Sequence, residues 1–450
     1  MMEMRVMSYN FGNKSKWTRN VVIVAAGLAS VIAMSCGNAH DGMNSDLNLD
    51  SFHSRAFDGF IDDGFIETAS ASDEIVRDQI EEQLRYSVGL LNTWSGVGDL
   101  SRTLAKSIKI KDRTVISEGR WRVSYTASMT VVWSNSYQRP ASVTLILPSS
   151  TDSNLGMPEK FVDRYNVESC LDPSNHGVGI GSIWYYLRPY QRGCELGNSR
   201  DASPLSVRFP MRLEESAINT SGHSPEYKKF WEDGKLVVTA VFSRNNPGND
   251  SGDVGFTQYQ YFYTKMVSTF GRPSHVSVDM PANGPDLKTT SYSATFNTRK
   301  GPIVIHTWLV DGMSNNGGDF DAKFAAATRD SDIINYNGHA GLGANVRGLA
   351  RRFAVNPGQY QLFVINGCDT FAYVDDLIMQ KHKDKNPGYP DYKFVDVIAN
   401  TMPSYFSYNT QTAVNVISAA VQSNATYRQI LSTFDRSQHA VVFGEEDNGQ

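Results

Sequence analysis

Two short apolar segments, each followed by a glycine and a reactive side chain, most constrain what this chain can fold into. The first, Ile333–Tyr336, leads through Asn-Gly to His339, and the second, Leu362–Ile365, leads through Asn-Gly to Cys368. Short apolar runs between turn-forming residues are typical of strands buried in a parallel sheet. The intervening sequence VRGLARRFAVNPG predicts the crossover helix that two neighbouring parallel strands require.

The two strand ends predict a reactive site. In open α/β sheets, ligands bind at the carboxyl ends of the strands, so we expect His339 and Cys368 at one edge. A thiolate is a nucleophile, and a nearby histidine can take its proton or lower its pKa. The backbone N–H groups of Gly338 and Cys368 are candidate oxyanion donors. The alternative is an inert thiol beside an ordinary turn histidine, since free cysteine is among the most buried residue types.

Residues 1–36 have the pattern of an export signal. Basic residues precede the apolar run VVIVAAGLASVIAM, which is shorter than the roughly 20 residues of a membrane-spanning helix. The run ends in IAMSC, which resembles the lipobox of bacterial lipoproteins, although Ala33 stands where leucine is commonest. This resemblance implies a palmitate-bearing lipid anchor on Cys36, the first residue of the mature chain. A plain secretory signal or a single membrane anchor is the alternative.

The residues that follow the signal bear on localisation. In this family of signals, an aspartate directly after the lipidated cysteine favours retention in the inner membrane. This chain has Gly37 and Asn38 there and lacks that aspartate. We therefore expect a protein anchored in the bacterial cell envelope, at the outer membrane, on its periplasmic or its surface face.

Export would place the chain in an oxidising compartment, where cysteines pair. With Cys36 lipidated, Cys170, Cys194 and Cys368 remain. Cys170 and Cys194 flank one stretch rich in glycine, proline and aromatic residues, and a bridge closing it would stabilise the fold by roughly 3 kcal/mol. We therefore predict a disulfide between Cys170 and Cys194 and a free thiol at Cys368.

The remaining patterns predict three further segments. Residues 37–72 are polar with isolated apolar residues, which predicts a flexible tether. Residues 73–215 start with helical spacing and continue as short alternating runs, typical of an antiparallel β-rich module. Residues 225–445 alternate strands and helices, which predicts an α/β domain with a mainly parallel sheet. The aromatic residues 184–186 are expected on a strand, where they either pack or form a platform for a sugar or peptide, packing being the more usual role.

Charge and motif content argue against several functions. A net charge of −5 gives no electrostatic case for nucleic-acid binding. The nine histidines are scattered without zinc spacing and the acidic runs lack the pattern of a calcium-binding loop, so we expect no metal and no other cofactor. The sequence also lacks the Gly-x-Ser-x-Gly elbow of serine hydrolases.

The two strand ends resemble those of the clan CD cysteine peptidases, which include gingipains, caspases, legumains and clostripain. The resemblance implies a caspase-like α/β domain in which His339 and Cys368 form the catalytic dyad on adjacent strands. These families usually have glycine directly after the histidine, where this chain has Ala340, and alanine before the cysteine, where it has Gly367. Both substitutes are small, so the turn geometry can be kept.

Together these features predict a membrane-anchored, exported cysteine endopeptidase, a hydrolase that uses His339 and Cys368 on peptide or protein substrates. The alternative is a catalytically inactive envelope lipoprotein with a binding or structural role. The reactivity of the Cys368 thiol separates the two.

Overall fold

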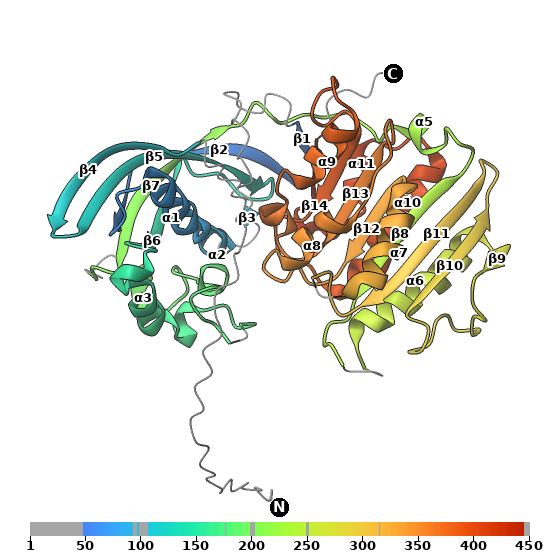
Figure 1. The fold of residues 1–450 in the computed structure, drawn as a ribbon, viewed down its shortest axis with the longest axis horizontal. Coiled ribbons are helices and arrows are strands. Elements are labelled where there is room, and N and C mark those ends of the chain that lie inside the picture. The colour runs from blue at the N-terminus through green and yellow to red at the C-terminus, as the bar shows by residue number, and fades with distance from the viewer. Residues whose placement is uncertain are drawn as a thin grey trace, which may run out of the picture. The chain divides into compact units, whose positions relative to one another are not determined.

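The computed structural model describes residues 48–92, 97–98, 107–175, 177–198, 203–248, 252–314 and 316–444. Within them the strands form a nine-stranded mixed sheet and a six-stranded antiparallel sheet (Figure 1). The described residues all belong to one compact unit of the chain. The predicted signal peptide and the lipid site at Cys36 lie outside the described residues, as does the 37–47 part of the predicted tether.

Five parallel strands form the centre of the large sheet. In spatial order they are β14 (Val395–Ala399), β13 (Gln361–Asn366), β12 (Ile333–Asn337), β8 (Leu236–Ser243) and β11 (Pro302–Val310). Every residue of β8, β12, β13 and β14 is buried, as expected for parallel strands covered on both faces. The two apolar runs Ile333–Tyr336 and Leu362–Ile365 are therefore in central strands.

The sheet is mixed, where the sequence predicted a mainly parallel one. At one edge, β15 (Val441–Phe443) and β1 (Leu49–Ser51) pair antiparallel; at the other, β10 (Ser291–Asn297) and β9 (His275–Val276) do so. The connection between β10 and β11 is residues 298–301, which is too short for a crossover and closes a hairpin. Both edges of the parallel centre thus end in antiparallel strands.

Helices cover both faces of this sheet (Figure 1). Helices α7 (Gly317–Arg329), α8 (Ala344–Arg352) and α9 (Leu377–Lys385) pack on the face that carries Phe363 and Ile365. The opposite face, with Leu362 and Val364, is covered by α6 (Val254–Phe270), α10 (Asn409–Gln422) and α11 (Tyr427–Leu431). Helix α8 is the predicted crossover between β12 and β13. No helix in the described part of the chain is long and apolar enough to cross a membrane.

The smaller sheet is built from long antiparallel strands. Their order is β3 (Val97–Gly98), β5 (Arg120–Ser134), β2 (Ser54–Thr68), β7 (Ser206–Glu215) and β6 (Ser142–Pro148), and β4 (Lys109–Ser117) also pairs with β5. Helix α1 (Asp73–Arg85) buries Val76, Ile80 and Leu84, and α2 (Ser87–Asn92) follows it directly. The predicted β-rich module is therefore present; we call it the antiparallel module.

Strand β2 corrects the prediction of a flexible tether over residues 37–72. It pairs with β5 along its whole length and with β7 near its start. Ala56, Ile61 and Ile66 are buried, whereas Asp62 and Asp63 are exposed. A register shift between Ile61 and Gly64 breaks the alternation of buried and exposed residues. The interrupted pattern, with polar residues at its centre, resembles the sequence of a flexible tether.

The aromatic residues 184–186 belong to a short helix, α4 (Ile183–Tyr186), which corrects their predicted place on a strand. The helix lies in the stretch closed by the Cys170–Cys194 disulfide, whose Cα atoms are 4.7 Å apart, and the predicted pairing is confirmed. Short helical segments complete the fold: α3 (Met157–Tyr165), α5 (Tyr227–Phe230), η2 (Ser153–Leu155), η3 (Glu168–Cys170), η4 (Glu195–Gly197), η5 (Thr370–Tyr373), η6 (Phe406–Tyr408) and η7 (Arg436–Gln438).

Candidate functional site

The carboxyl ends of β12 and β13 lie side by side at one edge of the sheet. Asn337 pairs with Asn366, and the Gly338 N–H donates to the Asn366 carbonyl over 3.0 Å. His339 and Cys368 each follow their paired asparagine by two positions. The histidine and the cysteine therefore leave the sheet from equivalent positions of neighbouring parallel strands.

Glycine is required before each of these residues because the two turns approach other atoms closely. A Cβ atom on Gly338 would lie 1.9 Å from the Ser243 hydroxyl oxygen, and one on Gly367 would lie 2.6 Å from the Gly338 carbonyl oxygen. Neither separation is sterically allowed. The glycines thus let the two turns sit against each other and against the end of β8.

A buried amide network lies beneath the turns. The Asn366 side-chain oxygen accepts hydrogen bonds from Asn400 Nδ2 and Gln438 Nε2, each over 2.8 Å. Asn366 Nδ2 donates to Asn409 Oδ1 over 3.1 Å, and Asn400 Nδ2 also donates to the Gly367 carbonyl over 3.0 Å. All of these residues are buried. Amides that bond one another in a dry interior fix the positions of the strand ends.

The backbone of His339 is held firmly while its ring remains exposed. The His339 carbonyl accepts from the Tyr336 hydroxyl over 2.7 Å and from Asn345 Nδ2 over 2.8 Å. The ring nitrogen Nε2 lies 3.0 Å from the Asn245 carbonyl, which it reaches as a donor. The ring edge also packs on Phe406, with centroids 4.9 Å apart. The imidazole is thus anchored on one side by the loop after β8 and on the other by an aromatic ring.

Cys368 is partly exposed, and its thiol donates to the Ser404 carbonyl over 3.6 Å. Burial of the sulfur, with a smaller contribution from the neighbouring Asp369 carboxylate, raises the pKa of the Cys368 thiol to about 11. Among the described residues no hydrogen bond joins Cys368 to His339. The resting form of the site is therefore a protonated thiol, because a free cysteine already has a pKa near 8.5.

The two candidate oxyanion donors differ. The Gly338 N–H is already bonded to Asn366, which corrects its predicted role as an oxyanion donor. The Cys368 N–H has no hydrogen-bond partner within the described residues and remains free to receive an oxyanion. The parallel ladder explains the difference, because it extends one residue beyond β12 and uses the Gly338 N–H.

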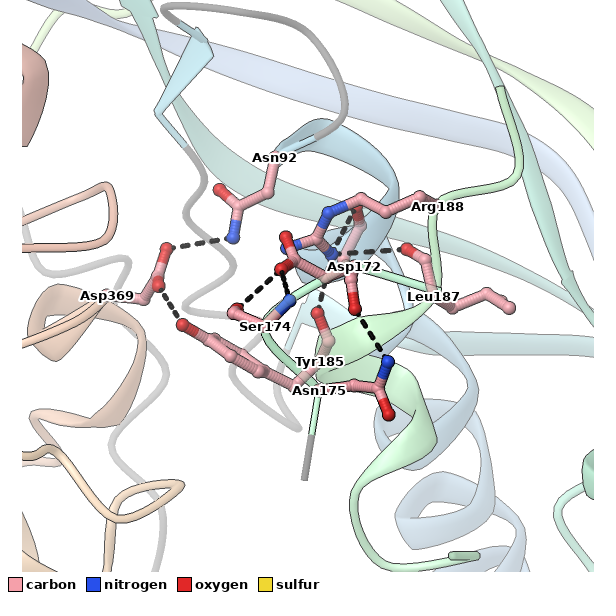
Figure 2. A network of polar contacts seen from close by, with 9 residues as sticks. Asn92, Asp172, Ser174, Asn175, Tyr185, Leu187, Arg188 and Asp369 are labelled. Carbon is pink, nitrogen blue, oxygen red and sulfur yellow. Dashed lines mark hydrogen bonds and ion pairs between the residues drawn. The ribbon is translucent and has the colours of Figure 1, made fainter. Parts of the chain in front are cut away.

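Asp369 is a site residue that sequence reasoning missed. Its side chain is 1% exposed, and its carboxylate accepts hydrogen bonds from Asn92 Nδ2 over 3.0 Å and from the Tyr185 hydroxyl over 2.8 Å (Figure 2). Burial raises the pKa of Asp369 to about 6, and these two hydrogen bonds oppose that rise. The available signal was an acidic residue directly after the candidate nucleophile.

Three aromatic residues lie on the loop after β14, which contacts both His339 and Cys368. Tyr405 is 61% exposed and Tyr408 is 39% exposed, with ring centroids 6.2 Å apart, and Phe406 lies between them in sequence. Exposed aromatic rings are suited to contact apolar parts of a ligand. Within the described residues, no group of three or more histidine, cysteine or acidic side chains is arranged to hold a metal ion.

Comparisons with known proteins add no evidence about the role of the site. No family model matches the sequence, and no curated protein matches it. Among solved structures, a peptidyl-tRNA hydrolase in complex with N-propanol is 11% identical over 48% of this chain and 97% of that chain, with a TM-score of 0.21. A likeness of this size carries no argument about fold or function.

Proposed function

We propose that this protein is an exported, lipid-anchored cysteine peptidase of the clan CD type, with Cys368 as nucleophile and His339 as the proton carrier. One observation carries the proposal. Two parallel strands in register, β12 and β13, each end in Asn-Gly followed by one member of the pair, above a buried amide network. This arrangement supports the proposal, because it brings a thiol and an imidazole to equivalent positions of neighbouring strands.

The reaction follows from the roles of the two side chains. The Cys368 proton moves to His339 as the sulfur bonds to the substrate carbonyl carbon, and the Cys368 N–H stabilises the oxyanion. The C–N bond then breaks as His339 gives its proton to the leaving amine. Water hydrolyses the thioester, its proton passes through His339 back to sulfur, and the acid product leaves.

For this chemistry His339 must exchange its bond to the Asn245 carbonyl for one to the thiol or the leaving group. Its exposed ring permits the rotation, and the aromatic loop that carries Tyr405, Phe406 and Tyr408 supplies apolar contacts for an extended peptide. Catalytic hydrogen bonds are often unmade before substrate binds, so their absence in the free protein is compatible with the proposal.

Export and lipid anchoring are parts of the same proposal. Their support is the signal pattern that ends at Cys36 and the Cys170–Cys194 disulfide, a bond that persists in oxidising compartments. The anchor would hold the peptidase at the outer membrane.

A second candidate is a catalytically inactive envelope lipoprotein with a binding or structural role. The raised pKa of the Cys368 thiol favours it, because a nucleophilic cysteine usually has a lowered pKa.

A cleavage assay separates the two candidates. We expect Cys368→Ala and His339→Ala each to lower turnover of a broad peptide library by at least about a thousandfold, and the double variant to be little worse, because the pair acts as one unit. His275→Ala, on exposed β9, is the matched control and should keep full activity. Retained activity in both single variants would place the chemistry elsewhere. A wild type that cleaves nothing and whose Cys368 resists alkylation would favour the inactive lipoprotein.

A further inference from the structure

We propose that Tyr185 and Asn92, both in the antiparallel module, are positioning residues that hold the Asp369 carboxylate beside Cys368 and thereby govern the reactivity of the thiol. The proposal rests on the proposed function in taking Cys368 as the nucleophile. It adds a role for the antiparallel module, which supplies both hydrogen-bond donors.

The two donors to the Asp369 carboxylate are far from it along the chain. Asn92 is 277 positions from Asp369 and Tyr185 is 184 positions from it, yet Asn92 donates to Oδ1 of its carboxylate and Tyr185 donates to Oδ2 (Figure 2). Burial raises the pKa of Tyr185 well above its usual value, so its hydroxyl keeps its proton and donates. A buried carboxylate is tolerated only when its oxygens are bonded in this way.

The backbone of Asp369 has an uncommon conformation that hydrogen bonds hold in place. Its φ angle is 50°, in the left-handed region that non-glycine residues rarely adopt. The Asp369 N–H donates to the Met402 carbonyl over 3.3 Å, and its carbonyl accepts from the Ala372 N–H over 3.0 Å. The turn that presents Cys368 is therefore held from both sides, by the loop after β14 and by the two side-chain donors.

Tyr185 is itself held in place by Arg188. Arg188 is 5% exposed; its Nη1 donates to the Tyr185 carbonyl over 2.6 Å and to the Gly89 carbonyl over 3.1 Å. Its Nη2 forms an ion pair with Asp172 over 2.9 Å, and Asp172 also accepts from the Ser174 N–H over 2.8 Å. This chain of bonds holds α4 in place, so the Tyr185 hydroxyl meets the carboxylate without reorganisation (Figure 2).

The charge of Asp369 acts on the Cys368 thiol. Asp369 directly follows Cys368, and a carboxylate disfavours a second negative charge next to it. The other titratable or charged groups that interact with the carboxylate or the thiol are Tyr185, Tyr186, Tyr336, Arg188 and Asp172, and Tyr373 also interacts with Tyr185. Asp369 is the negative charge nearest in sequence to the thiol. Removing it should make the thiolate easier to form.

The test measures the rate of Cys368 alkylation by iodoacetamide from pH 5 to pH 10, with the intact exported protein. Asp369→Asn keeps the shape of the side chain and should move the profile to lower pH, with alkylation at pH 8 about tenfold faster for each unit of pKa. Asn92→Ala should move it the same way but less, because the lost bond raises the neutral fraction of Asp369. Tyr185→Phe should move it less than Asn92→Ala, because Tyr185 also hydrogen-bonds the Cys368 thiol and lowers its pKa, and this variant loses that effect.

Tyr186→Phe is the matched control, because Tyr186 is the adjacent tyrosine but donates no hydrogen bond to Asp369; its profile should coincide with that of the wild type. Thermal unfolding of each variant identifies any that misfold, and Asp369→Asn then still tests the charge. Profiles for Asp369→Asn and Asn92→Ala that coincide with the wild type would overturn the proposal, as would a shift in Tyr186→Phe equal to that in Asp369→Asn. Alkylation needs no peptide substrate, so its failure is distinct from a failure of the cleavage assay.

Discussion

Asn337 and Asn366 lie opposite each other at the ends of β12 and β13, and the Asn366 side chain is the centre of the amide network that also includes Asn400, Asn409 and Gln438. The register of one asparagine pair therefore sets where His339 and Cys368 leave the sheet. Removing one member of such a network leaves buried polar groups of its neighbours without partners, which lowers stability.

Replacement of Asn366 should show this dependence directly. Asn366→Ala leaves the donors of Asn400 and Gln438 without their shared acceptor, and we expect the free energy of unfolding to fall by about 3 kcal/mol. Asn297→Ala, at the exposed end of β10, should change it by less than about 0.5 kcal/mol. Urea denaturation of both variants gives the comparison, and equal midpoints would show that the network contributes nothing to stability.

Asp369 should make stability depend on pH. Because its pKa is raised to about 6 in the folded protein, against about 3.9 in an unfolded chain, its contribution is fully present below pH 4 and is lost as the pH rises through 6. We expect the stability of the wild type relative to Asp369→Asn to fall by about 2 kcal/mol between pH 4 and pH 7. Denaturation curves at the two pH values measure it; a constant difference would mean that the folded-state pKa is unshifted.

The disulfide should stabilise the stretch that carries Tyr185. Replacing Cys170 and Cys194 together by serine removes a cross-link across a sequence separation of 24, and we expect a loss of about 3 kcal/mol. Mass mapping of the non-reduced wild type after treatment with iodoacetamide should find the label on Cys368 and never on the paired cysteines. A bridge that contained Cys368 would contradict the pairing.

Lipid attachment is expected at one residue. Cells that express the full chain and are fed an alkyne-labelled palmitate should label the wild type, and Cys36→Ser should lose the label and leave the membrane fraction. Cys368→Ser is the control and should stay labelled. A labelled Cys36→Ser protein would place the anchor elsewhere or show another means of membrane retention.

The sequence was sufficient for the features that are local. Apolar runs such as Leu362–Ile365, closed by Asn-Gly, identified the central strands and the crossover helix, because burial on both faces leaves a continuous apolar pattern. Strand β2 was missed because its bulge interrupts the alternation, and α4 was missed because four residues are too few to show helical spacing.

The sequence pattern does not predict the role of Asp369. Its partners Asn92 and Tyr185 are distant along the chain, and no periodicity connects them to it. The Gly338 N–H was misassigned because only the register of the sheet shows that it is used by Asn366. Hydrogen-bond partners that depend on tertiary contacts lie beyond pattern reasoning.

The early start of β1 has a consequence for reach. Cys36 lies thirteen positions before Leu49, where the chain enters the edge of the large sheet beside β15. Even fully extended, that length spans only about 45 Å. If Cys36 carries the lipid, the edge of the large sheet at Leu49 stays within that distance of the bilayer, and the folded body meets substrates that come near the membrane.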